Sequence, residues 1–207
     1  MPGKRVWVIG DIHGMFDPLN RLLQRIQLCE MRTGLPPATL VFLGDYIDYG
    51  PSSRQVLDAL IALRETFPCV FLAGNHEDLM LQFLREDELY RSYGNIWFRG
   101  NDGHETVVSL ATDPHVLQRA TASDAEKTIR PEDVQLSTAQ RAFIDGLKYA
   151  HTEVFTKGKR TVKIAFCHAL LHSGRNTGPT DAGPRTVSVE QQLALETYEQ
   201  FHQFRRE

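Results

Sequence analysis

The stretch TLVFLGDYIDYG, residues 39–50, decides the fold, because an apolar run there ends abruptly in glycine and aspartate. A run of about five β-branched and aromatic residues is typical of a buried strand. The same pattern occurs twice more: VWVI (6–9) leads into GDIHG (10–14), and CVFLA (69–73) leads into GNHE (74–77). Three such strands predict a largely parallel sheet with a ligand site at the carboxyl ends of its strands.

Helix-forming stretches separate the three strands. Apolar residues recur on one helical face over 16–28 and again over 52–66, so we expect a helix in each interval. Strands and helices that alternate in this way are typical of β-α-β units, and the sequence therefore predicts an α/β fold. Further along, we expect a helix over 78–91, a loop over 95–105 and a polar surface insertion or cap over 122–135.

The last third of the chain contains a helix and a hairpin. We expect the helix over 137–147, and two β-like runs follow it at 149–155 and 161–167. A four-residue link that contains glycine joins these runs, which is typical of a β-hairpin.

After residue 173 the chain becomes rich in glycine and proline and poor in apolar residues. Ser188 and Gln191 then form a capping-box pattern, which predicts a helix that runs to the end. We therefore assign residues 1–173 to one domain, 174–188 to a linker and 189–207 to a C-terminal helix.

Composition limits the class of protein. The 207 residues are 42% hydrophobic, which is typical of a globular chain and excludes disorder. The formal net charge of −3 gives no reason to expect nucleic-acid or membrane partners. No targeting or membrane-spanning segment is visible, and three cysteines, an odd number spread far apart, favour a reducing, cytoplasmic setting.

The polar residues after the strands have the chemistry of metal ligands. Carboxylate, amide and imidazole groups without thiolates suit manganese, iron or zinc. We expect Asp45 to bridge two divalent cations, with Asp11 and His13 on one ion and Asn75 and His168 on the other. His168 enters this set because it ends the strand-like run at 161–167.

These motifs, taken in order, resemble a known family over residues 5–170. Gly-Asp-x-His-Gly, Gly-Asp-x-x-Asp-x-Gly, Gly-Asn-His-Glu and a strand that ends in histidine are similar to the phosphoprotein-phosphatase-like group of calcineurin-type metallophosphoesterases. This group includes bacterial serine/threonine protein phosphatases and symmetrical diadenosine tetraphosphatases. The resemblance implies a four-layer αββα sandwich, two metal ions (Mn²⁺ first, with iron or zinc as alternatives) and hydrolysis of phosphoric monoesters.

The resemblance also suggests a mechanism. A hydroxide that bridges the two ions would attack phosphorus in line with the leaving oxygen. His76, next to the ligand Asn75, would protonate the leaving group, and Asp48 would hold its ring.

Two departures from the family pattern bear on activity. Tyr49 stands where the family has a phosphate-binding arginine, so we consider Arg54 as a substitute and Tyr49 as a ring that stacks on substrate. The alternative for Arg54 is an ordinary helix-surface arginine. Arg99 and Asn101, in a tryptophan- and glycine-rich segment, are further candidates for substrate binding.

The second departure is that nothing after His168 matches the family's last metal-binding histidine. We therefore expect a sandwich with an incomplete C-terminal part, in a truncated or shortened member of the family. Three functions stay open: a protein phosphatase, a diadenosine polyphosphate or nucleotide hydrolase, and a weakly active or inactive phosphate-binding protein.

Overall fold

The computed structural model describes residues 4–85, 96–123, 125–157 and 159–168. In chain order the elements are β1 (Val6–Ile9), α1 (Phe16–Thr33), β2 (Thr39–Phe42), α2 (Ser53–Leu63), β3 (Cys69–Phe71), α3 (Asn75–Phe83), α5 (Gly103–Leu110), α6 (Pro114–Ala120), α7 (Ala125–Thr128), a 3₁₀ turn (Pro131–Asp133), α8 (Thr138–Asp145), β4 (Ala150–Lys157) and β5 (Arg160–Cys167).

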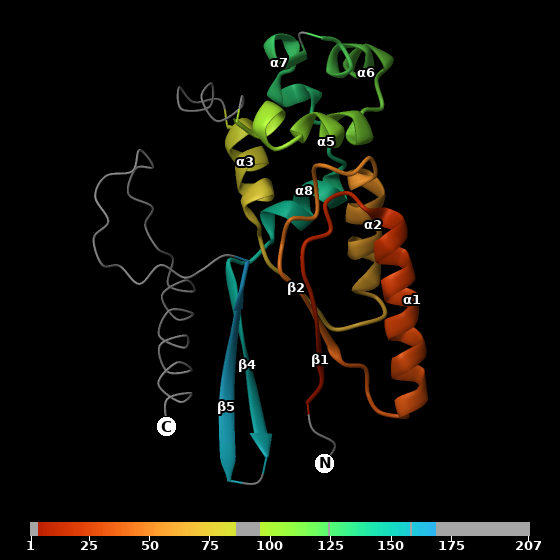
Figure 1. Ribbon diagram of the computed structural model, residues 1–207, viewed down its shortest axis with the longest axis vertical. Coiled ribbons are helices and arrows are strands. Elements are labelled where there is room, and N and C mark those ends of the chain that lie inside the picture. The colour runs from red at the N-terminus through yellow and green to blue at the C-terminus, as the bar shows by residue number, and fades with distance from the viewer. Residues whose placement is uncertain (1–3, 86–95, 124, 158, 169–207) are drawn as a thin grey trace, which may run out of the picture.

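The first three strands form one parallel sheet in the order β1-β2-β3, with Val8 opposite Val41 and Val41 opposite Val70. Figure 1 shows α1 and α2 together on one side of this sheet and the β4–β5 hairpin on the other. The chain thus has the expected α/β architecture, with a helical layer, a parallel sheet and an antiparallel hairpin. The linker expected over 174–188 and the helix expected over 189–207 lie outside the described residues.

The apolar faces predicted for the first two helices do build the core. Leu19 and Ile26 of α1 and Leu57 of α2 are buried, as expected from their spacing. A second group in the same core is aromatic: the rings of Phe42 and Phe143 both pack on Phe71. The sheet is therefore held by α1 and α2, which connect its strands, and by the packing of Phe143 of α8 on Phe71.

The hairpin is joined to the parallel sheet at two places. Lys148 pairs with Leu72, directly after β3, and Lys4, two residues before β1, forms an ion pair with the buried Glu153 of β4. These contacts bring the end of β5 to the same edge as the ends of β1, β2 and β3. His168 directly follows β5 and therefore lies at the carboxyl ends of the parallel strands, as the sequence predicts. Its Nδ1 is 3.0 Å from the carbonyl oxygen of Leu43, which directly follows β2.

Several boundaries differ from the sequence-based expectation. Helix α1 continues past residue 28 to Thr33 and ends at Gly34, which has the left-handed φ of 62° that glycine accommodates. Helix α3 begins at Asn75 rather than at 78 because the Glu77 carboxylate accepts the N–H of Gly74. The loop expected over 95–105 was wrong in part, since residues 96–100 are helical and α5 begins at Gly103.

The described residues of the polar segment over 122–135 pack on the rest of the protein. Ala125, Ile129 and Val134 are buried in the hydrophobic core, and Arg119 of α6 forms an ion pair with the buried Asp133. Among the described helices, none is both long and apolar enough to cross a bilayer.

Candidate metal centre

Two clusters of possible metal ligands lie at the carboxyl ends of the parallel strands. One cluster is His13, Asp45 and His76, and the other is Asp11, Asp45 and His168. In each cluster one ligand atom per residue lies within 4.8 Å of the others. Asp45 belongs to both, which is the arrangement expected of a carboxylate shared by two cations.

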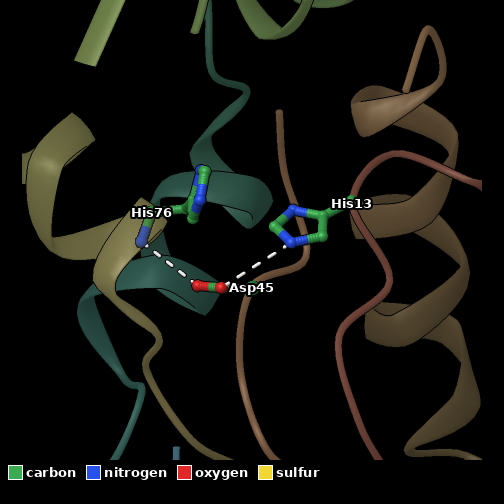
Figure 2. Close-up of side chains that lie close together, drawn as sticks. All are labelled: His13, Asp45 and His76. Carbon is green, nitrogen blue, oxygen red and sulfur yellow. Dashed lines mark hydrogen bonds and ion pairs between the residues drawn. The ribbon is translucent and has the colours of Figure 1, made fainter. Parts of the chain in front are cut away.

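Asp45 lies at the middle of the site, between three histidines that come from the loop after β1, from α3 and from the end of β5. Its Oδ2 is 3.1 Å from Nε2 of His168 and 3.7 Å from Nε2 of His13, and its Oδ1 accepts the backbone N–H of His76. Figure 2 shows this carboxylate between His13 and His76. Burial raises the pKa of Asp45, but the hydrogen bonds from His168 and His76 outweigh it and hold that pKa below its usual value. The carboxylate is therefore charged and available at neutral pH.

Backbone carbonyls hold the rings of the two outer histidines in the orientation that metal ligation needs. Nδ1 of His13 lies 3.0 Å from the carbonyl oxygen of Ile47, and Nδ1 of His168 lies 3.0 Å from that of Leu43. A carbonyl accepts only, so each Nδ1 carries a proton and each Nε2 faces Asp45. Nε2 of His168 donates a hydrogen bond to Oδ2 of Asp45, and a bound cation would take the place of that proton. Backbone carbonyls orient metal-binding histidines in the same way in other proteins.

The grouping of ligands differs from the expected one at Asp11. Its carboxylate belongs with Asp45 and His168, 3.9 Å from Nδ1 of His168, whereas we expected it to pair with His13. Asn75 does lie where it was expected, because its Oδ1 is 3.1 Å from Nε2 of His168. Carboxylate, amide and imidazole donors at this spacing fit divalent transition-metal ions.

His76 and Asp48 form a buried hydrogen-bonded pair beside the metal ligands. Nδ1 of His76 is 2.7 Å from Oδ2 of Asp48, and both side chains are at most 5% exposed. Burial lowers the pKa of His76, but the hydrogen bond and charge of Asp48 raise it more, so the net shift is upward. The His76 ring also lies 4.7 Å from the His13 ring, centroid to centroid. A histidine with a raised pKa at this place can donate a proton to a group bound at the metal ligands.

Sequence reasoning missed two residues that hold Asp48. Trp97 donates its indole N–H to Asp48 Oδ2 at 2.8 Å, and Thr106 donates its hydroxyl to Asp48 Oδ1 at 2.5 Å. Gly103 lets the chain pass close to Trp97, because a Cβ there would lie 2.6 Å from the indole ring. The signal in the sequence was a lone tryptophan before Gly-x-x-Gly, which does not specify a partner 49 residues away.

The loops that carry the ligands have unusual backbone conformations. His13, Asp45, Asp48 and Tyr49 all have φ between 46° and 71°, in the left-handed region that non-glycine residues rarely adopt. Such residues cost about 1–3 kcal/mol each and persist where the surrounding structure fixes them. Their concentration on two loops marks these loops as a functional site.

Of the proposed substrate-binding residues, Tyr49 lies nearest to the ligands. Its ring centroid is 4.8 Å from that of His13 and 5.1 Å from that of His76, and its side chain is 46% exposed. Arg54 instead donates from its guanidinium to the carbonyls of Ser109 and Leu110 at the end of α5. These contacts give Arg54 a part in the docking of α2 on α5.

The other two candidates lie in the helical segment over 96–100 and just after it. Asn101 donates its side-chain amide to the carbonyl of Ile96 at 2.8 Å, so it caps that segment. Arg99 lines a pocket next to α5, together with Asp102 and Glu105. The structure therefore brings Tyr49 to the ligands and gives Arg54 and Asn101 contacts with backbone carbonyls elsewhere.

Comparison with known proteins identifies a family. A family model described as calcineurin-like phosphoesterase matches residues 4–192. Among solved structures, the hypothetical protein PH1004 from Pyrococcus horikoshii OT3 is 18% identical, with a TM-score of 0.43. That match covers 76% of this chain and 53% of the other, so this chain spans about half the length of that protein.

Proposed function

Because the chain belongs to the calcineurin-like phosphoesterase family and is therefore a metal-dependent hydrolase, we propose that it acts on phosphoric monoesters, as bacterial serine/threonine protein phosphatases do. The observation that carries this proposal is the position of Asp45 in both ligand clusters, together with the hydrogen bond from His76, a member of the first cluster, to the buried Asp48. This arrangement supplies both of the requirements of phosphoester hydrolysis, which are a place for two cations and a proton donor.

The residues that would hold the cations are Asp11, His13, Asp45, Asn75 and His168. We propose Mn²⁺ as the metal, with iron or zinc as alternatives, since the donors mix imidazole with carboxylate and lack thiolates. When bound, two such ions supply charge neutralisation at the phosphoryl oxygens and an acidified water as nucleophile.

His76 carries the proton in this mechanism. Asp48 accepts the N–H on Nδ1, so the proton available for transfer is on Nε2 of the imidazolium. The N–H of Trp97 and the hydroxyl of Thr106 also donate to Asp48, one to each carboxylate oxygen, and fix the direction of its carboxylate. Protonation of the leaving oxygen matters most for alkyl esters, whose alkoxide is a poor leaving group.

Tyr49 specifically favours a second candidate, a diadenosine polyphosphate or nucleotide hydrolase. Its ring is half-exposed beside the ligands, where a base or another aromatic group of a substrate can stack on it. Arg99 and Asn101 stay as proposals for contact with the rest of the substrate, whereas the contacts of Arg54 favour a structural role.

The first experiment measures metal content and hydrolysis together. Two Mn²⁺ ions per chain and Mn²⁺-stimulated hydrolysis of an aryl phosphate are the expected results. Turnover of a phosphoserine peptide compared with diadenosine tetraphosphate then separates the two candidates. A single tightly held ion without stimulated hydrolysis would support the third possibility, a weakly active or inactive phosphate-binding protein.

We further propose that residues 1–173 form the catalytic domain and that the protein works in the cytoplasm. All three cysteines, Cys29, Cys69 and Cys167, are free thiols, which agrees with a reducing compartment.

A further inference from the structure

Glu77 is a fully buried carboxylate that the hydrolytic mechanism does not use. It lies in the first turn of α3 and accepts three backbone N–H groups. Its Oε2 accepts from Gly74 and from Asp45, both at 2.9 Å, and its Oε1 accepts from Tyr46 at 2.8 Å. One side chain therefore joins the loop after β2 to the loop after β3.

These two loops meet backbone to backbone. A Cβ at Gly44 would lie 2.5 Å from the backbone nitrogen of Gly74, and one at Gly74 would lie 2.5 Å from the backbone nitrogen of Asp45. The first loop carries Asp45, which has the left-handed φ of 53°, and the second carries Asn75. Any change in the spacing of the loops would therefore move one ligand relative to another.

The chemistry of Glu77 suits the task of holding that spacing. Buried backbone N–H groups need acceptors, and the N–H groups of Asp45 and Tyr46 find theirs in this one carboxylate. A carboxylate accepts at both oxygens, whereas a glutamine amide of the same shape would turn an NH₂ group toward one of the three donors.

We propose that Glu77 is a positioning residue of the metal centre, whose carboxylate fixes the Asp45 loop against the Asn75 loop and thereby sets the affinity for divalent cations. The inference rests on the metal centre of the proposed function. Glu77 is not one of the proposed metal ligands: it acts on them only through the backbone of the two loops that carry them. Partners of this outer kind typically change metal affinity by about 10–100-fold when they are substituted.

The test is titration of Mn²⁺ into the metal-free full chain, by calorimetry, for the wild type and Glu77→Gln. We expect Glu77→Gln to bind Mn²⁺ at least about tenfold more weakly than the wild type. The matched control is Glu30→Gln, because Glu30 is also buried and also accepts three donors, from Arg5, Trp7 and Ala38. Glu30 lies on α1, away from both ligand clusters.

Thermal unfolding separates positioning from ordinary structural support. Both variants should lower Tm, but only Glu77→Gln should lower Mn²⁺ affinity. Equal Mn²⁺ affinity of folded Glu77→Gln and wild type would overturn the proposal, and so would an equal loss of affinity in Glu30→Gln. If Glu77→Gln does not fold, Glu77→Asp replaces it under the same criteria. A wild type that binds no Mn²⁺ would instead contradict the proposed metal centre itself.

Discussion

At the residue scale, the chemistry of the site depends on a few side chains that have different tasks. Asp45 belongs to both clusters of possible metal ligands, His76 is the proposed proton donor, and the ring of Tyr49, the proposed substrate contact, lies beside His13. Because the tasks differ, substitutions at these positions should have effects that can be told apart.

Asp45→Asn should remove hydrolysis and metal retention together. The substitution replaces the shared anionic ligand by a neutral amide, and metal ions contribute several kcal/mol to phosphoryl transfer. At about 1.36 kcal/mol per tenfold, we expect kcat/KM to fall by at least about 10²–10³-fold. Metal analysis after desalting, alongside the rate, is the measurement. Full activity with normal metal content would show that Asp45 is not a shared ligand.

His76→Asn should leave the metal content nearly unchanged and slow the reaction according to the leaving group. General acid catalysis increases the rate by about 10²–10⁴-fold when the leaving group is poor. A phosphoserine peptide should therefore lose far more rate than an aryl phosphate, whose leaving group needs little protonation. Equal losses for both substrates would argue against His76 as the acid.

At the element scale, the loops after β1 and β2 are as closely packed as the loops that Glu77 joins. A Cβ at Gly14 would overlap the carbonyl of Gly50, and Gly14 has a left-handed φ of 60°. Gly14 therefore allows the loop with His13 to lie against the loop with Tyr49, so the rings of these residues can meet.

Gly14→Ala should destabilise the protein and reduce activity. The left-handed conformation alone costs an alanine about 1–2 kcal/mol, and the overlap with Gly50 adds to that cost. Gly10→Ala is the control, because a Cβ at Gly10 would meet no heavy atom within 4 Å. Chemical denaturation of both variants checks the prediction, which fails if Gly14→Ala is as stable as Gly10→Ala.

Glu30 ties α1 to β1 and should make stability depend on pH. Burial raises the pKa of this carboxyl. Hydrogen bonds from Trp7 and Ala38 and the charge of Arg5 lower the pKa by more than burial raises it, so the folded-state pKa lies below the usual 4.5. Its contribution is therefore present above pH 4.5 and is lost as the pH falls through the folded-state pKa. Glu30→Gln should lower Tm at pH 7, and the difference from wild type should narrow below pH 4.5. A difference that is constant between pH 7 and 3 would contradict this assignment.

At the scale of the whole molecule, the proposed metal ligands come from both layers of strands. Asp11 and Asp45 follow β1 and β2 of the parallel sheet, and His168 follows β5 of the hairpin. An ion held by all three would therefore link the hairpin to the sheet. Ligands that bind only the folded state stabilise it according to their concentration and affinity.

Addition of Mn²⁺ should therefore raise Tm. At a concentration 100 times Kd the gain is about 2.7 kcal/mol, or about 5–10 °C for a chain of this size. His168→Ala should lose a large part of this increase, whereas His104→Ala should keep it, because His104 belongs to neither ligand cluster. Calorimetry with Mn²⁺ and with EDTA gives both values. An increase that is the same in all three proteins would exclude His168 as a ligand.

The sequence by itself determined the three parallel strands, the β4–β5 hairpin and the residue types at the strand ends. These features are local, since they depend on periodicity and on turn residues within about ten positions. The sequence pattern predicted the end of the first helix too early, at residue 28. The next helical turn is polar and contains Glu30, and only the tertiary structure shows that Glu30 is buried against Trp7.

The sequence also predicted that Asp45 is shared and that Asp48 holds His76, but only the tertiary structure decided several other contacts of the site. It grouped Asp11 with His168, gave Asp48 its partners Trp97 and Thr106, and used Arg54 to dock α2 on α5. The physical reason is distance along the chain: each of these contacts joins residues that are about 50 or more positions apart. No local pattern encodes such a pairing, because it exists only after the sheet, the helices and the hairpin have packed together.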